Sequence, residues 1–333
     1  MQITIGTFNT YNLFTRYKFR GRRKRFPAPA GSGKKYIYKW VKYSVQELYD
    51  AVKDGFSFHS HAFLRLSQED RELTAAVVEA LDADILAVQE VESLDTLKLF
   101  NSQQLRSSRK FRYKYMISGN DMRGIDIGLL SKYPTRSLVT HQYIRNAANT
   151  AYLFSRDCLE LELEVDGRPL HVFVNHLKSM FGGRAETRPR RAEQAQGIID
   201  ILTERFGPNF GDADFVVLGD LNDYVEPGEE DKSGITALTQ STEMEDVVAR
   251  LPKEQRWTYY YHKERAYNQL DYLFLSRSLA ARNTGVLPTI ERRGMPQIVN
   301  HQQSPPKVPE FFSGVSGTTK ASDHAGVSIT IDF

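Results

Sequence analysis

The chain has 333 residues, of which 41% are hydrophobic and 26% are charged. This composition is that of an ordinary globular protein and excludes disordered and collagen-like classes. No apolar run approaches the roughly 18 to 20 residues of a spanning helix, and the N-terminus opens directly into a strand-like alternation, so we expect neither stable membrane insertion nor a signal peptide. The single cysteine, Cys158, has no partner for an intrachain disulfide, and we expect it to be an inert packing residue. These features predict a cytoplasmic protein, with a secreted mature form as the alternative.

The net charge of +3 conceals a strongly basic segment. Residues 16–42 contain 11 of the 44 Lys and Arg residues and none of the 41 Asp and Glu residues, which leaves a net charge of −8 elsewhere. Residues 17–42 look like an irregular insertion rich in Arg, Lys, Gly and Pro, in which Tyr36, Tyr38 and Trp40 interleave with lysines. Such a mixture can contact phosphates and stack on bases, although a solvated surface loop explains it equally well. A basic arm on an acidic body is the pattern expected where a polyanion is drawn to a site lined with carboxylates.

The first elements in chain order are a strand from residue 3 and a helix over 68–81. The helix follows a capping box that begins at Ser67, and its apolar residues recur at helical spacing. The apolar run at 85–88 predicts a buried strand, which delivers Gln89 and Glu90 at its end. This segment therefore places a carboxylate at the end of a strand.

The second half of the chain also has expected strands that end at polar residues. Alternating residues at 159–165 and 170–174, joined by Asp166-Gly167, predict a hairpin that ends at Asn175 and His176. We expect a helix over 189–205, a buried strand at 215–218 that ends at Asp220, and further strands at 270–275 and 327–331. Polar residues thus collect at strand ends, where a rigid sheet can position a shared site.

These polar residues are of the types that phosphate-ester hydrolysis requires. The phosphate charge repels nucleophiles, so the reaction needs a metal or cationic clamp, an activated water and stabilisation of developing charge. A hard cation prefers oxygen ligands. The candidate groups, each beside an expected strand, are Asn9, Glu90, Asp220, Asn222, Asp271, Asp323 and His324.

Seven short motifs occur in the order seen in the endonuclease/exonuclease/phosphatase superfamily, which the chain resembles from residue 8 to 324. They are Phe8-Asn9-Thr10-Tyr11-Asn12-Leu13, Val88-Gln89-Glu90-Val91, Gly128-Leu129-Leu130-Ser131-Lys132-Tyr133-Pro134, Asn175-His176-Leu177-Lys178-Ser179, Gly219-Asp220-Leu221-Asn222-Asp223, Gln269-Leu270-Asp271-Tyr272 and Ser322-Asp323-His324. The resemblance implies an α/β (α+β) fold: a four-layer sandwich of two mixed β-sheets packed face to face, with helices outside and a site at one edge. It also implies a single domain spanning 1–333, with a basic insertion at about 16–60.

The metal ligands implied by the resemblance are Glu90, Asn9 and, as in some members, Asp323. The expected ion is Mg²⁺, with Mn²⁺ or Ca²⁺ as alternatives. Many relatives carry Asp or Glu two residues after the first Asn, where this chain has Tyr11. One carboxylate is therefore missing, and the metal site is either weaker or completed by Asn12 or a water.

The catalytic roles implied by the resemblance fall on five residues. Asp220 resembles the group that orients or deprotonates the attacking water, and Asn222 the group that holds a phosphate oxygen. His324 resembles the histidine on the scissile phosphate, with Asp271 as its carboxylate partner. His176 matches a second histidine that binds phosphate or protonates the leaving oxygen. The structural alternative is that an Asn or Asp at these positions merely caps a loop, or that a histidine is simply a core residue.

Nucleic acid is the substrate that we expect, with little sequence specificity, since phosphate contacts position a substrate without reading its bases. Arg123 and Lys178 are candidate phosphate contacts, although both can be ordinary surface charges. His59 and His61 lie outside any motif and are interpreted as a solvated pair. The alternatives are a phosphomonoesterase, a phospholipid phosphodiesterase of the same superfamily, and a catalytically inactive nucleic-acid-binding module. We expect a monomer.

Overall fold

The structure is a computed structural model and describes residues 1–13, 22–41, 67–121, 123–261, 264–297 and 308–333. The chain divides into two compact units, one formed by Met1–Leu13 with Ser67–Phe333 and the other by Phe14–Leu66. The predicted pair His59 and His61 lies outside the described residues. The expectation of one domain over 1–333 with an insertion at about 16–60 stays a prediction.

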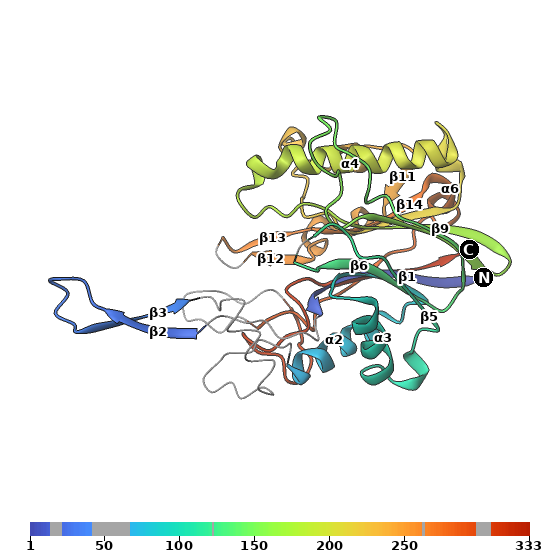
Figure 1. The fold of residues 1–333 in the computed structure, drawn as a ribbon. Coiled ribbons are helices and arrows are strands. Elements are labelled where there is room, and N and C mark those ends of the chain that lie inside the picture. Colours follow the sequence, from blue (N-terminus) through green and yellow to red (C-terminus); the bar gives the residue numbers. More distant parts are fainter. Residues whose placement is uncertain (14–21, 42–66, 122, 262–263, 298–307) are drawn as a thin grey trace. The chain divides into compact units, whose positions relative to one another are not determined.

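The larger unit contains two six-stranded mixed sheets (Figure 1). The first has the order β15 (Thr289–Glu291), β16 (Gly326–Asp332), β1 (Gln2–Leu13), β4 (Ile85–Val91), β6 (Asp126–Ser131), β5 (Tyr113–Met116). The second has the order β11 (Met244–Asp246), β14 (Asp271–Ser276), β10 (Phe215–Asp220), β9 (Arg168–His176), β8 (Cys158–Val165), β7 (Thr135–Val139). A separate two-stranded sheet consists of β12 (Tyr259–Tyr261) and β13 (Ala266–Asn268).

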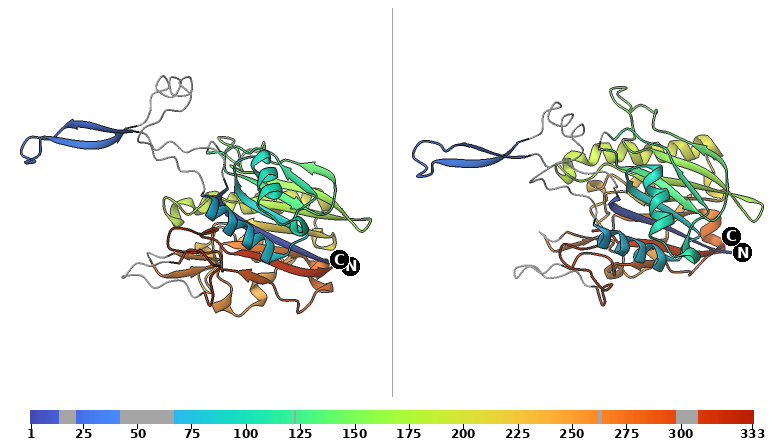
Figure 2. Two further views of the ribbon diagram at one scale, coloured as in Figure 1. Left: turned by 90° about the horizontal axis from the view of Figure 1, so that it is seen from below. Right: turned by 60° about the horizontal axis from the view of Figure 1, so that its bottom comes forward.

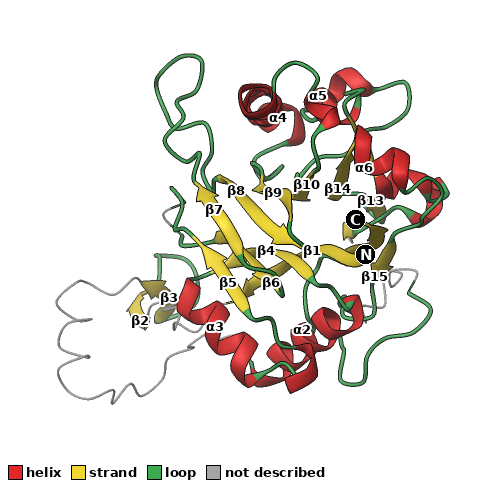
Figure 3. Ribbon diagram, turned by 90° about the vertical axis from the view of Figure 1, so that its right-hand side faces the viewer, coloured by secondary structure: helices red, strands yellow, loops and turns green. Residues whose placement is uncertain are grey.

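The two large sheets pack face to face, and helices cover their outer faces (Figure 3). The helices are α2 (Gln68–Leu81), α3 (Leu94–Gln103), α4 (Arg184–Phe206), α5 (Thr236–Thr239) and α6 (Arg277–Arg282). Short 3-10 turns occur at η1 (Ser107–Arg109), η2 (Phe210–Asp212), η3 (Glu230–Lys232), η4 (Val247–Arg250) and η5 (Lys253–Gln255). Helices α2 and α3 lie on the first sheet, and α4 lies on the second. The predicted four-layer sandwich is confirmed.

Two apolar layers stabilise this sandwich. Inward-facing residues of both sheets, such as Ile5, Leu161 and Leu218, form the layer between the sheets, and all three are fully buried. A second layer, which includes Phe173 and Ile198, lies between the second sheet and α4. Alternating residues of one strand therefore serve two cores, as the strand period of two requires.

The local sequence signals place several elements where they were expected. The Ser67 hydroxyl accepts a hydrogen bond from the amide of Asp70 at 3.0 Å and caps α2 at its predicted start. Asp166 and Gly167 both adopt positive φ in the β8–β9 turn. Cys158 is fully buried, and burial raises the pKa of its thiol well above the usual value, in agreement with an inert packing role.

Helix α4 begins at Arg184, five residues before the predicted start at Pro189. A proline inside a helix costs one backbone hydrogen bond, and side-chain bonds stabilise these first turns instead. The guanidinium of the fully buried Arg191 donates to the Arg184 carbonyl at 2.8 Å and to the Asp223 carboxylate at 2.7 Å. The sequence pattern does not reveal this tertiary anchor, so the predicted start was wrong.

The described part of the smaller unit is a β-hairpin of β2 (Arg22–Pro27) and β3 (Tyr36–Val41), drawn in blue in Figure 2. The expectation of an irregular segment over 17–42 was wrong for these residues. A turn joins the two strands, with the amide of Ser32 bonded to the Pro29 carbonyl at 3.2 Å and positive φ at Gly31 and Gly33. β-Branched and aromatic residues favour the second strand even without an apolar period.

The two chain ends of the larger unit lie side by side (Figures 1 and 2). The amide of Phe333 donates to the carbonyl of Met1 at 2.8 Å, which closes the pairing of β1 with β16. Among the described residues, no helix is both long and apolar enough to cross a membrane.

Candidate active site

The topology brings the ends of four strands to one edge of the sandwich. β1 runs parallel to β4, and β9 runs parallel to β10, so each pair ends at the same edge. Within the second sheet, Asp220 pairs in register with His176 on one side and with Asp271 on the other. The loop that carries His324 enters β16 antiparallel to β1 and therefore reaches the same edge. Residues more than 300 positions apart in sequence thus share one site.

Backbone geometry at the strand ends explains the glycine of the Gly219-Asp220 motif. Gly219 has φ of 138°, and a Cβ at this position would lie 1.9 Å from the carbonyl oxygen of Asn175. No side chain fits there, because the neighbouring strand approaches too closely. Two residues after Asp220, Asn222 adopts φ of 54° and turns back towards that carboxylate.

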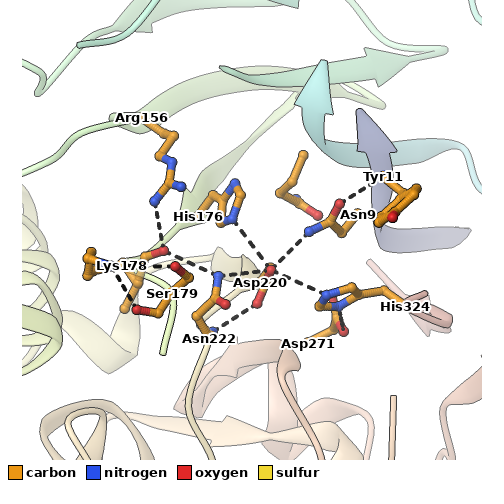
Figure 4. A network of polar contacts seen from close by, with 12 residues as sticks. Asn9, Tyr11, Arg156, His176, Lys178, Ser179, Asp220, Asn222, Asp271 and His324 are labelled. Atoms are coloured by element: carbon orange, nitrogen blue, oxygen red, sulfur yellow. Dashed lines mark hydrogen bonds and ion pairs between the residues drawn. The ribbon is translucent and has the colours of Figure 1, made fainter. Parts of the chain in front are cut away.

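Asp220 is the centre of the polar network in Figure 4. Its Oδ2 accepts hydrogen bonds from Asn9 Nδ2 at 2.9 Å and from Asn222 Nδ2 at 3.0 Å. Its Oδ1 accepts the Asn222 backbone amide at 2.8 Å. His176 Nε2 and His324 Nε2 lie 3.5 Å and 3.8 Å from Oδ2. Four other predicted site residues therefore lie within hydrogen-bond or ion-pair distance of the Asp220 carboxylate.

The protonation of Asp220 is set mainly by burial. Its side chain is about 1% exposed, and burial raises its pKa to about 7, against the opposing effect of His324 and of the hydrogen bond from Asn9. A carboxylate with a pKa near neutrality is suited to accept a proton at physiological pH.

His324 is held by Asp271. Its Nδ1 lies 2.8 Å from Asp271 Oδ2, and the Asp271 amide donates to the Thr258 hydroxyl at 3.0 Å. Burial alone would lower the pKa of His324, but Asp271 and Asp220 outweigh burial and raise the pKa well above the usual value. The Ser322 hydroxyl donates to the Asn9 carbonyl at 2.7 Å and accepts the His324 amide at 3.0 Å, so it ties this loop to β1. His324 is therefore held in one orientation, and its neighbours favour the protonated ring.

The pKa of His176 is shifted in the opposite direction to that of His324. Burial, followed by the positive charges of Arg156 and His324, lowers the pKa of His176 well below the usual value. Within the described residues, its Nδ1 has no hydrogen-bond partner. The two histidines that contact Asp220 in Figure 4 thus have pKa values shifted in opposite directions.

Glu90 and Asp323 form the acidic side of the site. Glu90 lies at a bulge where the pairing of β4 shifts, and it adopts φ of 63°. Burial and then the charge of Asp323 raise the pKa of Glu90, and burial raises the pKa of Asp323. Two buried carboxylates with raised pKa values are suited to bind a cation. With Asn9 on the adjacent strand, this pair fits a divalent metal.

A tighter cluster of candidate ligands lies beside that pair. Among the described residues, one oxygen or nitrogen from each of Asp220, Asp271 and His324 lies within 4.8 Å of the others. However, His324 Nδ1 is already bonded to Asp271, and Asp220 already accepts bonds from Asn9 and Asn222. In the described part of the chain, Asp271 Oδ1 has no hydrogen-bond partner, whereas Asn9 Oδ1 already accepts the Tyr11 amide at 3.0 Å. The expected metal ligands Glu90, Asp323 and Asn9 therefore stay a prediction.

Arg123 and Lys178, the two predicted substrate contacts, are both engaged within the protein. Arg123 donates to Asp121 at 3.0 Å and 2.8 Å. The Lys178 ammonium donates to the Ser179 carbonyl at 3.0 Å. Arg123 also interacts electrostatically with Glu90, and the charges of Arg156 and Arg123 contribute to lowering the pKa of Lys178 after burial. The expected phosphate contacts of both residues stay predictions.

Arg156 is a site residue that sequence reasoning missed. It is about 3% exposed, its Nη1 donates to the Leu177 carbonyl at 3.1 Å, and its Nε lies 3.1 Å from Asp121. Arg156 thereby positions the segment after His176 and adds positive charge beside Glu90. No motif surrounds it, and an isolated arginine before a strand gives no signal in the sequence.

The comparison with known families gives a match over most of the chain. A model of the Endonuclease/Exonuclease/phosphatase family matches residues 65–331. The chain belongs to this family. Family members are hydrolases that act on phosphoester bonds and use divalent metal ions, and the candidate acidic and histidine groups are present here. The predicted family is confirmed.

The solved structures of similar fold include proteins that are named for different activities. Truncated TDP2 of Caenorhabditis elegans has 16% identity and a TM-score of 0.57, covering 100% of this chain and 98% of that chain. TDP2 of D. rerio, complexed with a single-strand DNA product, has 14% identity and a TM-score of 0.54, covering 100% and 99%. The mannosyl-6-phosphatase of Bacteroides thetaiotaomicron has 13% identity and a TM-score of 0.54, covering 99% and 100%. At these identities the likeness shows the fold alone. A search of the curated proteins finds no match.

Proposed function

We propose that this member of the Endonuclease/Exonuclease/phosphatase family hydrolyses phosphodiester bonds of DNA or RNA, with a divalent metal and little sequence specificity. The observation that carries the proposal is the buried Asp220, bonded to Asn9 and Asn222, between a charged and a neutral histidine. This arrangement supplies a proton acceptor and a cation beside one edge of the sandwich.

Glu90, Asp323 and Asn9 would hold the metal. Carboxylate and amide oxygens suit Mg²⁺, and we propose Mg²⁺ with Mn²⁺ as a substitute. When bound, the ion polarises the phosphoryl oxygen and stabilises charge that develops on it. The effect of the Asp323 charge on the ionisation of Glu90 is the feature of this chain that supports a cation there.

The remaining groups position the reactants and handle protons. Asp220 accepts the proton of the attacking water, and Asn222 keeps the carboxylate oriented through its side-chain and backbone N–H groups. His324, charged and fixed by Asp271, places its Nε2 proton where a phosphate oxygen can accept it. Because the pKa of His176 is lowered, its favoured role is to donate a hydrogen bond as a neutral ring rather than to act as a general acid.

The substrate proposal rests on the basic segment. The hairpin β2–β3 carries Arg22, Arg23, Lys24 and Arg25 on one strand, and the other strand has Lys39 between Tyr38 and Trp40. Among the structures of similar fold, D. rerio TDP2 is complexed with a single-strand DNA product. Both observations favour a polyanion, whereas the name of the mannosyl-6-phosphatase points to phosphomonoesters.

The test of the activity is nicking of supercoiled plasmid with Mg²⁺ or Mn²⁺, together with a panel of small phosphoesters. We expect cleavage that EDTA abolishes and that Asp220→Ala reduces to background. The matched control is Asp200→Ala, since Asp200 is an exposed aspartate on α4. Release of inorganic phosphate from small monoesters without cleavage of nucleic acid would assign a phosphomonoesterase. Absence of metal-dependent hydrolysis of any phosphoester would contradict the proposed activity and leave a binding module.

The test of the arm is exchange of Arg22, Arg23, Lys24 and Arg25 for Ser. Affinity for nucleic acid should fall, and the slope of log K against log salt should flatten by about 0.7 to 0.9 for each phosphate that the variant no longer neutralises. Turnover of bis(p-nitrophenyl) phosphate should be unchanged. An unchanged salt slope would assign the hairpin to another task.

Cytoplasmic location and the monomeric state stay predictions, and size-exclusion chromatography tests the monomeric state.

A further inference from the structure

Tyr11 occupies an unusual backbone position beside the proposed metal ligands. Tyr11 and Asn12 have φ of 50° and 61°, consecutive left-handed conformations at non-glycine residues. Such conformations cost of order 1 kcal/mol or more each and persist only where surrounding contacts fix them. Here the Tyr11 amide donates to Asn9 Oδ1 at 3.0 Å, and the pairing of β1 with β4 shifts between Asn9 and Leu13. The chain therefore maintains a strained turn that presents Tyr11 next to Asn9, as Figure 4 shows.

The Tyr11 ring lies between acidic and basic groups. Tyr11 is 37% exposed, and burial followed by the charges of Asp323 and Glu90 raises the pKa of its phenol. On another side, the Lys320 ammonium lies 4.5 Å from the centroid of the ring. A cation at this distance is attracted by the aromatic face. The ring therefore holds an ammonium next to the metal ligands.

The position of Lys320 is fixed by its backbone. Its amide donates to Asp70 Oδ1 at 2.9 Å, at the start of α2, and the next amide donates to the Gly294 carbonyl at 2.8 Å. Within the described ranges, however, the Lys320 ammonium has no hydrogen-bond or ion-pair partner. The charge of Lys320 acts on Asp323 and opposes the rise in the pKa of that carboxyl, but no bond to a carboxylate of these ranges occupies the ammonium. An anchored main chain that holds an ammonium in this position points to an anionic ligand.

The charge balance of the site supports this interpretation. Glu90 and Asp323 together carry two negative charges when both are ionised, which a divalent cation would neutralise. Lys320 then adds one positive charge beside the proposed metal ligands. A carboxylate in place of Tyr11 would pair with Lys320 and cancel that charge, whereas the aromatic ring holds the ammonium without neutralising it.

We propose that Tyr11 and Lys320 form a substrate-binding pair, in which the ring positions the ammonium to bind an anionic oxygen of the phosphoester beside the metal ligands. The inference rests on the proposed function and deepens it, because it names two residues that set affinity for the phosphate group. Lys320 contacts the substrate, and Tyr11 acts through Lys320 as a positioning residue.

The test compares Lys320→Gln with Lys98→Gln, a lysine on the exposed surface of α3. Two readouts are the KM and kcat for bis(p-nitrophenyl) phosphate with Mn²⁺ and, independently of turnover, the Kd of inorganic phosphate by calorimetry. Lys320→Gln should raise both KM and Kd about tenfold, a modest loss for a hydrogen bond to a charged group. The kcat should change less than about threefold, and Lys320→Arg should restore most of the affinity. Equal values for the two Gln variants would overturn the proposal.

Variants of Tyr11 separate its positioning role from a structural one. Tyr11→Phe keeps the ring and should bind phosphate like the wild type, whereas Tyr11→Leu should behave like Lys320→Gln. In a Tyr11→Asp background, removal of the lysine should no longer affect KM, because the carboxylate already neutralises it. Mn²⁺ affinity, followed by electron paramagnetic resonance, should be unchanged in Lys320→Gln and higher in Tyr11→Asp.

The two proposals fail in different ways. If the wild type hydrolyses no phosphoester but binds inorganic phosphate more tightly than Lys320→Gln, the proposed function fails and the pair stands. If the wild type is active while Lys320→Gln and Tyr11→Leu match it in both KM and Kd, the pair fails and the proposed function stands.

Discussion

Replacing Asp271 with Asn tests whether the charge behind His324 is required for turnover. Asp271 is fully buried, and its Oδ2 lies 2.8 Å from His324 Nδ1. The Asn variant keeps the volume of the side chain but removes the negative charge. Because Asp271 is the largest of the influences that raise the pKa of His324, the variant should lower that pKa.

The expected loss of activity follows from this geometry. Two unit charges 2.8 Å apart interact by about 6 kcal/mol at an effective dielectric of about 20. Part of this energy is recovered by the amide dipole and by the remaining charge of Asp220. In a Ser-His-Asp triad the corresponding Asp→Asn change costs about 10⁴-fold in turnover, or about 5.5 kcal/mol. We therefore expect kcat for bis(p-nitrophenyl) phosphate to fall about 10³-fold, with little change in KM.

The assay includes a pH profile and a matched control. In the wild type His324 stays charged through the neutral range, since its pKa is raised. In Asp271→Asn, activity should fall as pH rises, because the lowered pKa lets the ring lose its proton. The control is Asp246→Asn, whose carboxyl already has a pKa raised by burial to about 6. A kcat within about threefold of wild type for Asp271→Asn, with an unchanged pH profile, would refute the role assigned to this pair.

Three further predictions concern stability and metal binding. Burial would raise the pKa of Glu160, but His141 at 3.1 Å, His171 at 3.6 Å and the charge of Arg205 outweigh burial and lower the pKa to about 2. Glu160→Gln should therefore cost up to about 3 kcal/mol in urea unfolding at pH 7, and the difference should vanish as pH falls from about 4.5 through about 2. Arg191→Met should cost about 3 kcal/mol or more by the same assay, because it leaves the buried carboxylate of Asp223 without its nearest cation. Mg²⁺ at ten times its Kd should raise the free energy of unfolding by about 1.4 kcal/mol and so raise Tm in a thermal scan. Glu90→Gln should remove this rise in Tm. A rise that persists in the variant would place the ion elsewhere.

Local patterns in the sequence were sufficient to predict most strands of the two large sheets. The alternation that ends at His176 and the apolar runs that end at Glu90 and Asp220 each correspond to an observed strand. The capping box at Ser67 likewise marks the start of α2. These signals succeed because hydrogen bonding and burial within one strand or one helical turn depend on neighbouring residues.

Other features depend on contacts that no local pattern contains. The early start of α4 relies on the buried Arg191, whose carboxylate partner lies 32 residues away. The hairpin β2–β3 has no apolar period, and its register comes from pairing across the turn. Arg156 enters the site only because the chain folds its loop against the segment after His176.

The sequence by itself determined the family, the order of the motifs and the types of side chain that could act on a phosphoester. Only the tertiary structure decided their chemical states. It placed Asp220 between two histidines of opposite character, with the pKa of His324 raised and that of His176 lowered. It also brought the ammonium of Lys320 to the ring of Tyr11, 309 positions earlier in the chain. The reason is physical: burial and the distances between charges set ionisation, and both exist only once strands from the two sheets meet at one edge.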